Sequence, residues 1–247
     1  SESSQALPAG SPIGRAALIS MKILAIDTSQ AAVSACIMGD GGALLARETQ
    51  LMARGHAEAL LPLLQRVSQA AGVAFSSLER IAVVVGPGSF TGIRIGIAAG
   101  RALGLAAGVP VVGVSALAAF AAPLIGREGA GVIAAAVDAK HGQVYVQGFT
   151  VKGQPLAAPR ITNVRDAVRT LGAGPLVFAG SGATMMAIEA WSLGAQAEVA
   201  GETVTPDIGF VARLGALADP ATAPARPYYL KAPDAKPQAN GVIARTA

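Results

Sequence analysis

Apolar positions along the chain alternate between the short runs typical of strands and the three-to-four-residue spacing typical of helices. Three consecutive strand patterns come first, and turn residues separate them. The first clear helical pattern follows, because leucines and a valine between residues 56 and 71 repeat at helical spacing. For the first half we expect strands at 22–27, 31–38, 43–50, 81–85 and 111–114, and helices at 56–71, 92–107 and from 115 onward.

The second half repeats this order. We expect strands at 132–137, 143–150, before 160, at 176–179 and near 198, and helices at 163–171, at 183–193 and from about 205 to 218, with Thr205, Pro206 and Asp207 as N-cap and first-turn residues. Each half then has the order β-β-β-α-β-α-β-α. Two matching features support a duplication. Asp27 and Asp138 both stand where a first strand turns into a second, and glycine turns at 86–88 and 180–182 both join a strand to a helix.

A duplicated unit of this kind predicts the α/β fold class, with the two-lobed actin/hexokinase-like (ASKHA, ribonuclease H-like) architecture. This assignment of a fold rests on analogy with that element order. We expect an N-terminal lobe at 21–125 and a C-terminal lobe at 126–225. Residues 1–20 have the composition of a disordered extension or a remnant, and 226–247 form a tail that we expect to return to the N-terminal lobe.

Composition narrows the classes of function. Hydrophobic residues make up 52% of the 247 residues, while aromatic residues contribute 4%, so the interior is built from small aliphatic side chains. The net charge of +4 comes mostly from the tail at 226–247, so a folded basic face is not indicated. Two interpretations of the tail stay open: a solvated end, or a contact with RNA or an acidic partner.

Cysteine and histidine are scarce. A single Cys36 excludes a disulfide framework and indicates a reducing cytoplasm. His56 and His141 are far apart and lack metal-ligand spacing, so we expect no metal site. The uncharged span 102–125 is interrupted by Gly108 and Pro110, which leaves pieces too short to cross a bilayer. We therefore expect a cytoplasmic protein with no membrane contact.

The most distinctive stretch is GPGSFTGIRIG at residues 86–96. It lacks the lysine of a P-loop, departs from the dinucleotide-binding spacing and has no GxSxG frame, so those three classes are not supported. Asp27 and Asp138 leave two interpretations open: handling of a phosphate or metal, or turn chemistry. The helix that follows carries a glycine at every fourth position from 92 to 108. Each interior glycine costs about 0.5–1 kcal/mol relative to alanine, which indicates close packing either on the protein's own sheet or on a partner.

Several stretches together resemble the bacterial TsaB (YeaZ) family. They are ILAIDTSQAAVSACI, GHAEALLPLL, VVVGPGSFTGIRIGIAAGRALGLAAGVPVVGVSAL, VDAKHGQVYV and PYYLK, and they extend from residue 21 to about 231. Small departures are Ile93, where leucine is usual, and Arg101, where lysine is common. The resemblance implies the two-lobed fold and a part in forming N6-threonylcarbamoyladenosine in tRNAs that read ANN codons.

The resemblance also implies a division of labour. The related TsaD subunit is catalytic, TsaB is a non-catalytic scaffold that pairs with TsaD, and the ATPase TsaE joins them. The chain would form a homodimer when alone and meet tRNA through the complex, with ATP or ADP bound only through partner subunits. TsaD proteins have a metal-binding N-H-x-x-G-H where this chain has residues 115–120, SALAAF, so both metal-binding histidines are missing.

Two groups of site residues follow from these arguments. Remnants of phosphate loops would be Asp27, Thr28, Ser29, Gly86, Gly88 and Ser89. A partner interface on the helices at 56–71 and 92–107 would include His56, Leu60, Leu64, Gly92, Arg94, Gly96, Gly100 and Gly104. Two other functions stay open beside the scaffold: a stand-alone ATP-dependent small-molecule kinase of the same fold, and a protease. A kinase would turn over ATP with a small substrate in the absence of other proteins. For a protease, the sequence lacks candidates for a nucleophile and for a metal site.

Overall fold

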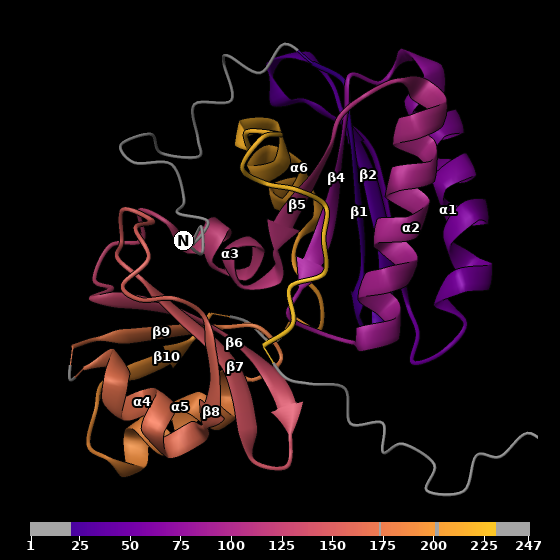
Figure 1. The fold of residues 1–247 in the computed structure, drawn as a ribbon. Helices are drawn as coiled ribbons and strands as arrows, with labels where there is room; N and C mark the ends of the chain where they lie inside the picture. The colour runs from indigo at the N-terminus through magenta and orange to yellow at the C-terminus, as the bar shows by residue number, and fades with distance from the viewer. Residues whose placement is uncertain (1–20, 173, 201–202, 231–247) are drawn as a thin grey trace, which may run out of the picture.

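The computed structural model describes residues 21–172, 174–200 and 203–230, which form two lobes, each built on a five-stranded sheet (Figure 1). In the first sheet the strand order is β3-β2-β1-β4-β5. The first three strands are antiparallel neighbours, and β4 and β5 add in parallel beyond β1. These strands are β1 (Ile23–Gln30), β2 (Ala32–Met38), β3 (Leu44–Leu51), β4 (Arg80–Gly86) and β5 (Val111–Ser115).

The second sheet repeats this topology. Its order is β10-β9-β6-β7-β8, which gives the order of the first sheet when it is read in reverse, with β6 in the place of β1. The strands are β6 (Val132–Lys140), β7 (Gln143–Phe149), β8 (Arg160–Asn163), β9 (Leu176–Ala179) and β10 (Ala197–Val199). The predicted duplication and the actin/hexokinase-like fold class are therefore confirmed.

Two helices cover the outer face of each sheet. On the first sheet these are α1 (His56–Ala71) and α2 (Phe90–Ala107), which pack side by side (Figure 1). On the second sheet they are α4 (Val164–Leu171) and α5 (Ala183–Ser192). The first-lobe core lies between α1, α2 and the central strands, where branched side chains such as Leu63, Leu64 and Val83 are fully buried. Burial of this apolar surface is the main force that holds the helices on the sheet.

The inner faces of the sheets are filled by α3 (Ala116–Ala121) and α6 (Ile208–Leu217). Figure 1 shows α6 on the face of the first sheet opposite α1 and α2, and its buried residues pack there with Ala25, Ala82 and Val112. The expected C-terminal lobe at 126–225 was therefore wrong for this helix. The small Gly215 allows α6 to lie against the first sheet, since a Cβ there would come within 2.3 Å of the Ala82 Cβ.

The bounds of two strands and the N-cap of α6 differ from the expectations. The third strand of the second half begins at Arg160 instead of ending before it. The N-cap of α6 is Asp207, whose carboxylate accepts from the Gly209 N–H, and not Thr205, whose hydroxyl bonds elsewhere. A carboxylate at an N-cap satisfies a backbone donor that the helix leaves unpaired. β1 also continues past Asp27 to Gln30, with an irregularity in its pairing to β2.

Residues 219–230 run from α6 back along the first lobe. The Gly113 N–H donates to the Ala223 carbonyl at 2.9 Å, and the Tyr228 N–H donates to the Val85 carbonyl at 2.9 Å. This segment covers the β5 side of the first sheet, and its residues 228–230 line the space between the lobes. The expected extension at 1–20 and the tail beyond 230 lie outside the described residues.

Among the helices that the structure describes, α2 is long and apolar enough to cross a membrane by length and composition alone. Its glycine-bearing face packs against β1 and β4, as the contacts of Gly96 and Gly100 show. The buried, glycine-bearing side of α2 therefore belongs to the first-lobe core.

Candidate functional site

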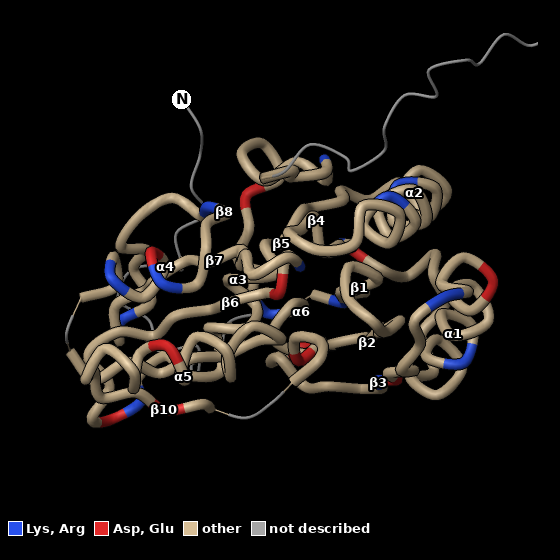
Figure 2. The backbone as a smooth tube through the Cα atoms, turned by 90° about the horizontal axis from the view of Figure 1, so that it is seen from below, with Lys and Arg blue, Asp and Glu red and all other residues tan. Residues whose placement is uncertain are grey.

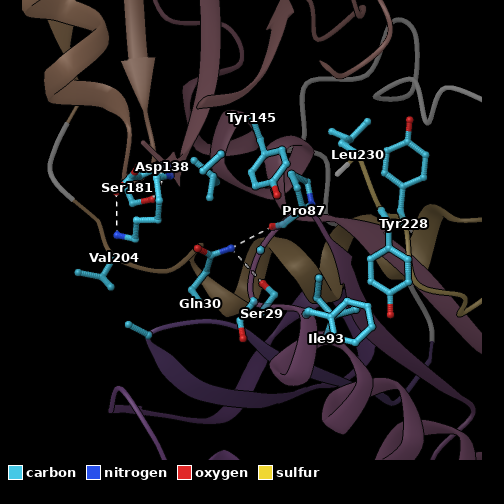
Figure 3. A pocket seen from close by; sticks show the side chains of 18 of the residues that line it. Ser29, Gln30, Pro87, Ile93, Asp138, Tyr145, Ser181, Val204, Tyr228 and Leu230 are labelled. Atoms are coloured by element: carbon cyan, nitrogen blue, oxygen red, sulfur yellow. Dashed lines mark hydrogen bonds and ion pairs between the residues drawn. The ribbon is translucent and has the colours of Figure 1, made fainter. Parts of the chain in front are cut away.

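A cleft of about 670 Å³ lies between the two lobes and is the candidate site (Figure 3). Both halves of the chain contribute walls, and the segment that ends at Leu230 closes one side. The polar lining residues are Ser29, Gln30, His56 and Ser89 from the first lobe, and Asp138, Lys140 and Ser181 from the second. The aromatic lining residues are Phe90, Tyr145, Tyr228 and Tyr229.

The first-lobe wall is formed by the end of β1 and the glycine turn after β4. The Gln30 amide nitrogen donates to the Pro87 carbonyl at 3.1 Å and to the Ser29 hydroxyl at 3.2 Å (Figure 3). The His56 Nε2 lies 2.9 Å from the Gln30 carbonyl, so the start of α1 is tied to the same wall. These bonds fix the positions of the cleft's small polar side chains.

Backbone packing explains the glycine turn. The Ser89 N–H donates to the Ser29 carbonyl at 2.8 Å. A Cβ at Gly88 would lie 2.2 Å from that same carbonyl oxygen, and a Cβ at Gly92 would lie 2.0 Å from the Thr28 carbonyl oxygen. No side chain fits at these separations, so the glycines allow α2 and its turn to touch β1 directly.

Asp27 lies beneath the cleft and does not reach it. Its side chain is buried, with one oxygen accepting from the Ser29 N–H at 2.7 Å and the other from the Thr205 hydroxyl at 3.1 Å. Burial raises the pKa of the Asp27 carboxyl, although these bonds and His56 act in the opposite direction. Thr28 is buried as well, and its hydroxyl donates to the Gly92 carbonyl at 2.7 Å. Asp27 and Thr28, expected in a ligand-binding loop, are therefore internal to the lobe.

The second-lobe wall is the β6–β7 hairpin and the turn after β9. The Asp138 carboxylate accepts two hydrogen bonds from Lys140, one from its backbone N–H at 2.7 Å and one from its Nζ at 2.8 Å. Burial opposes ionisation of Asp138, but the bonds and charge of Lys140 outweigh it and lower the pKa of that carboxyl. The Asp138 N–H donates to the Ser181 hydroxyl at 3.2 Å. Lys140 and His141 both have left-handed backbone angles, which the hairpin turn requires.

The candidate phosphate loops are therefore brought together, but three of their backbone N–H groups donate hydrogen bonds within the protein. The N–H groups of Ser29 and Ser89 bond within the first lobe, and the Gly182 N–H donates to the Ala136 carbonyl at 2.9 Å in the second. A phosphate needs several convergent donors or a cation. Within the described ranges, no group of three or more histidine, cysteine or carboxylate side chains is placed to hold a metal ion.

The glycine stripe of α2 faces the sheet. A Cβ at Gly96 would come within 2.5 Å of the Thr28 Oγ1, one at Gly100 within 2.4 Å of a Val83 methyl, and one at Gly104 within 2.3 Å of a Val111 methyl. The expected partner interface was wrong for the inward-facing residues Leu60, Leu64, Gly92, Gly96, Gly100 and Gly104, all of which are buried. Arg94 is exposed and His56 is half-buried at the cleft, so neither is excluded from a contact.

The opposite face of the same helices is solvent-exposed. On α2 it includes Arg94, Ala98, Arg101, Ala102 and Leu105, and on α1 it includes Leu61. Leu105 is 88% exposed and Leu61 is 57% exposed, so both are large apolar side chains in contact with solvent. Figure 2 shows basic and no acidic positions along α2, in agreement with its sequence. We name Leu61, Arg94, Ala98, Arg101, Ala102 and Leu105 the outer α1/α2 face. Helical spacing alone predicts this exposed stripe once the glycines are placed inward.

The segment at 115–120 forms the start of α3. Its residues from Ala116 to Phe120 are buried, and Ser115 caps the helix by accepting from the Ala118 N–H. This segment presents alanine, leucine and phenylalanine, which are not metal ligands. Sequence reasoning also missed the aromatic residues of the cleft. The PYY run at 227–229 was noted only as part of a resemblance, although its paired tyrosines were a signal.

The duplicated sheets and the cleft between them define an actin/hexokinase-like protein. The family model of TsaD, described as tRNA N6-adenosine threonylcarbamoyltransferase, matches residues 49–190. A tRNA threonylcarbamoyladenosine biosynthesis protein TsaB of Escherichia coli is 38% identical over 125 residues, which span 51% of this chain and 53% of that protein. The chain thus aligns with about half the length of that relative.

Two further comparisons cover most of the chain. An uncharacterized protein of Mycobacterium tuberculosis is 34% identical over 219 residues, 88% of this chain and 95% of that protein. The solved structure of YeaZ from Pseudomonas aeruginosa covers 85% of this chain and all of its own, with a TM-score of 0.69 and 27% identity. The chain belongs to the TsaB/YeaZ family, whose members take part in tRNA threonylcarbamoyladenosine modification.

Proposed function

We propose that the chain is the non-catalytic subunit of a tRNA threonylcarbamoyl transferase, partner of the catalytic TsaD subunit in forming N6-threonylcarbamoyladenosine in tRNAs that read ANN codons. The observation that carries the proposal is family membership combined with a cleft in which the N–H groups of Ser29, Ser89 and Gly182 and the Lys140 ammonium are bonded internally. The segment at 115–120 adds to this, because it lacks the imidazoles that a metal-assisted transfer uses.

The outer α1/α2 face is the proposed docking surface for TsaD. It joins two exposed leucines with small alanines, which let a second helix approach closely, and the two arginines Arg94 and Arg101. Apolar anchors surrounded by polar groups are typical of stable protein interfaces. The arginines favour a partner with acidic residues, and the same face serves a homodimer when TsaD is absent.

The remaining partners follow from this arrangement. TsaE joins the complex and supplies ATP hydrolysis, tRNA is bound by the assembly, and the chain works in the cytoplasm without a cofactor of its own. The basic sequence at 226–247 is a candidate for a contact with tRNA or a partner.

Reconstitution tests the proposal. Threonylcarbamoylated tRNA is measured with TsaD, TsaE and the enzyme that forms the threonylcarbamoyl-AMP adduct, with and without this chain. We expect omission to abolish modification. Equal modification without the chain would overturn the scaffold role, and turnover of ATP with a small substrate by the chain alone would support a kinase instead.

A further inference from the structure

The cleft has an aromatic side whose rings the scaffold role does not use. The rings of Phe90 and Tyr229 stack with their centroids 4.8 Å apart and an interplanar angle of 25°. The Arg94 guanidinium lies 5.1 Å from the Phe90 centroid and so extends the stack. Tyr229 is 43% exposed at the edge of the cleft. On the second lobe, Tyr145 projects from β7 toward Gln30 and Pro87 (Figure 3).

The polar groups around these rings suit an uncharged ligand. The Ser89 hydroxyl accepts from the Gly92 N–H, and the Ser181 hydroxyl accepts from the Asp138 N–H. A hydroxyl that accepts a bond still carries its own hydrogen for donation. The two walls therefore offer donors of the kind that pair with the ring nitrogens and carbonyl oxygens of a nucleobase.

The same cleft is poorly suited to a chain of phosphates. The Lys140 ammonium is held by Asp138 at 2.8 Å, and the N–H groups of Ser89 and Gly182, one in each glycine turn, are bonded within the protein. A triphosphate would have to break these bonds to gain its own. A planar base makes no such demand, because its affinity comes from ring contact.

We propose that the cleft binds a nucleobase, through stacking on Tyr229 and hydrogen bonds from the serines of both walls, and that it does not bind nucleoside triphosphates in preference to nucleosides. The base comes either from a free nucleoside or from a single-stranded RNA segment. This proposal stands apart from the scaffold role, because that role is measured by reconstitution of modification and this one by binding to the isolated chain.

The experiment titrates the purified full chain by calorimetry with three probes: adenosine, ATP with Mg²⁺, and a single-stranded oligoadenylate of eight nucleotides. We expect adenosine or the oligonucleotide to bind, and ATP to bind no more tightly than adenosine. Binding of the oligonucleotide without adenosine identifies RNA as the source, and comparable binding of both identifies the nucleoside. Absence of binding by both, or ATP binding tenfold tighter than adenosine, would overturn the proposal.

Ring variants test the contact. Tyr229→Ala should weaken binding by about 5- to 140-fold, the range that corresponds to one lost base–aromatic stack. Tyr229→Phe keeps the ring and should retain the affinity. Tyr145→Leu and Tyr145→Phe repeat the comparison on the second lobe, and thermal unfolding of each variant confirms that it is folded. Unchanged affinity in Tyr229→Ala and in Tyr145→Leu would contradict ring stacking.

Discussion

Replacing Gly92 with alanine tests most directly whether the glycines of α2 exist for packing inside the protein. The added Cβ would lie 2.0 Å from the Thr28 carbonyl oxygen and 3.2 Å from its carbon. Both are backbone atoms of β1, a buried strand in the middle of the first sheet, so neither can move without shifting α2 or the strand. The Thr28 hydroxyl bond to the Gly92 carbonyl would be disturbed at the same time.

Two effects of opposite sign decide the outcome. Alanine in a helix is favoured over glycine by about 0.5–1 kcal/mol. Overpacking a tight core costs about 1–3 kcal/mol, and the rigid backbone neighbour places this site near the upper end. We expect Gly92→Ala to lower the free energy of unfolding by about 2 kcal/mol, which corresponds to a fall in Tm of about 4–8 °C for a chain of this size.

The assay is urea and thermal unfolding followed by circular dichroism. Ala98→Gly on the exposed side of α2 is the matched control, because it changes helix propensity in the same helix without a clash, and it should cost about 1 kcal/mol. A Gly92→Ala protein that is as stable as the wild type, or more stable, would refute the packing explanation.

The remaining predictions concern the buried Asp27 and Cys36 and the half-buried Arg80. Burial raises the folded-state pKa of Asp27, so the contribution of its protonated form to stability is lost as the pH rises from about 4 through the raised pKa. Unfolding at a series of pH values should therefore show the stability of the wild type falling relative to that of Asp27→Asn over that window. Parallel pH dependence of the two proteins would contradict this prediction. One guanidinium nitrogen of Arg80 donates to the carbonyls of Gly215, Ala216 and Ala218 at the end of α6. Arg80→Met should therefore lower the free energy of unfolding by about 2–3 kcal/mol. A loss smaller than the error of urea titration would show that this cap of α6 is dispensable. Burial raises the pKa of the Cys36 thiol to about 12, so iodoacetamide should label it at pH 8 only after unfolding. Mass spectrometry measures the labelling. Rapid labelling of the folded chain would contradict the burial of this thiol.

The elements were predictable from the sequence because their signals are local. The leucine spacing at 56–71 and the glycine Gly72 after it define α1, whose left-handed C-cap is that glycine. The duplication was also predictable, since the same order of strands, helices and glycine turns occurs twice. These signals depend only on neighbours along the chain.

The direction of packing was harder to predict. A stripe without side chains has the same sequence whether it meets the protein's own sheet or a partner, so the glycines of α2 did not distinguish the two. The buried Ile93 and Ile97 beside Gly92 and Gly96 point to the inward orientation, because a helix buries its large apolar residues on one side.

Contacts between segments far apart in the chain could not be predicted from local sequence patterns either. The apolar face of α6 predicts burial but does not say which sheet it covers, and α6 returns to the first lobe. Asp27 and Asp138 occupy equivalent places in the two halves, yet the connection before α6 brings Thr205 over Asp27 and leaves Asp138 at the cleft. The difference arises from segments about 178 residues apart in the chain.

The most direct measurement of the central claim is the dissociation constant of the complex with TsaD for the variant Leu105→Glu. Leu105 is 88% exposed, so the substitution leaves the fold intact and places a charge in the outer α1/α2 face. Ile188→Glu, an exposed apolar position on α5, is the control. We predict that Leu105→Glu weakens association at least tenfold while Ile188→Glu does not. Equal affinity of both variants and the wild type would contradict docking through this face.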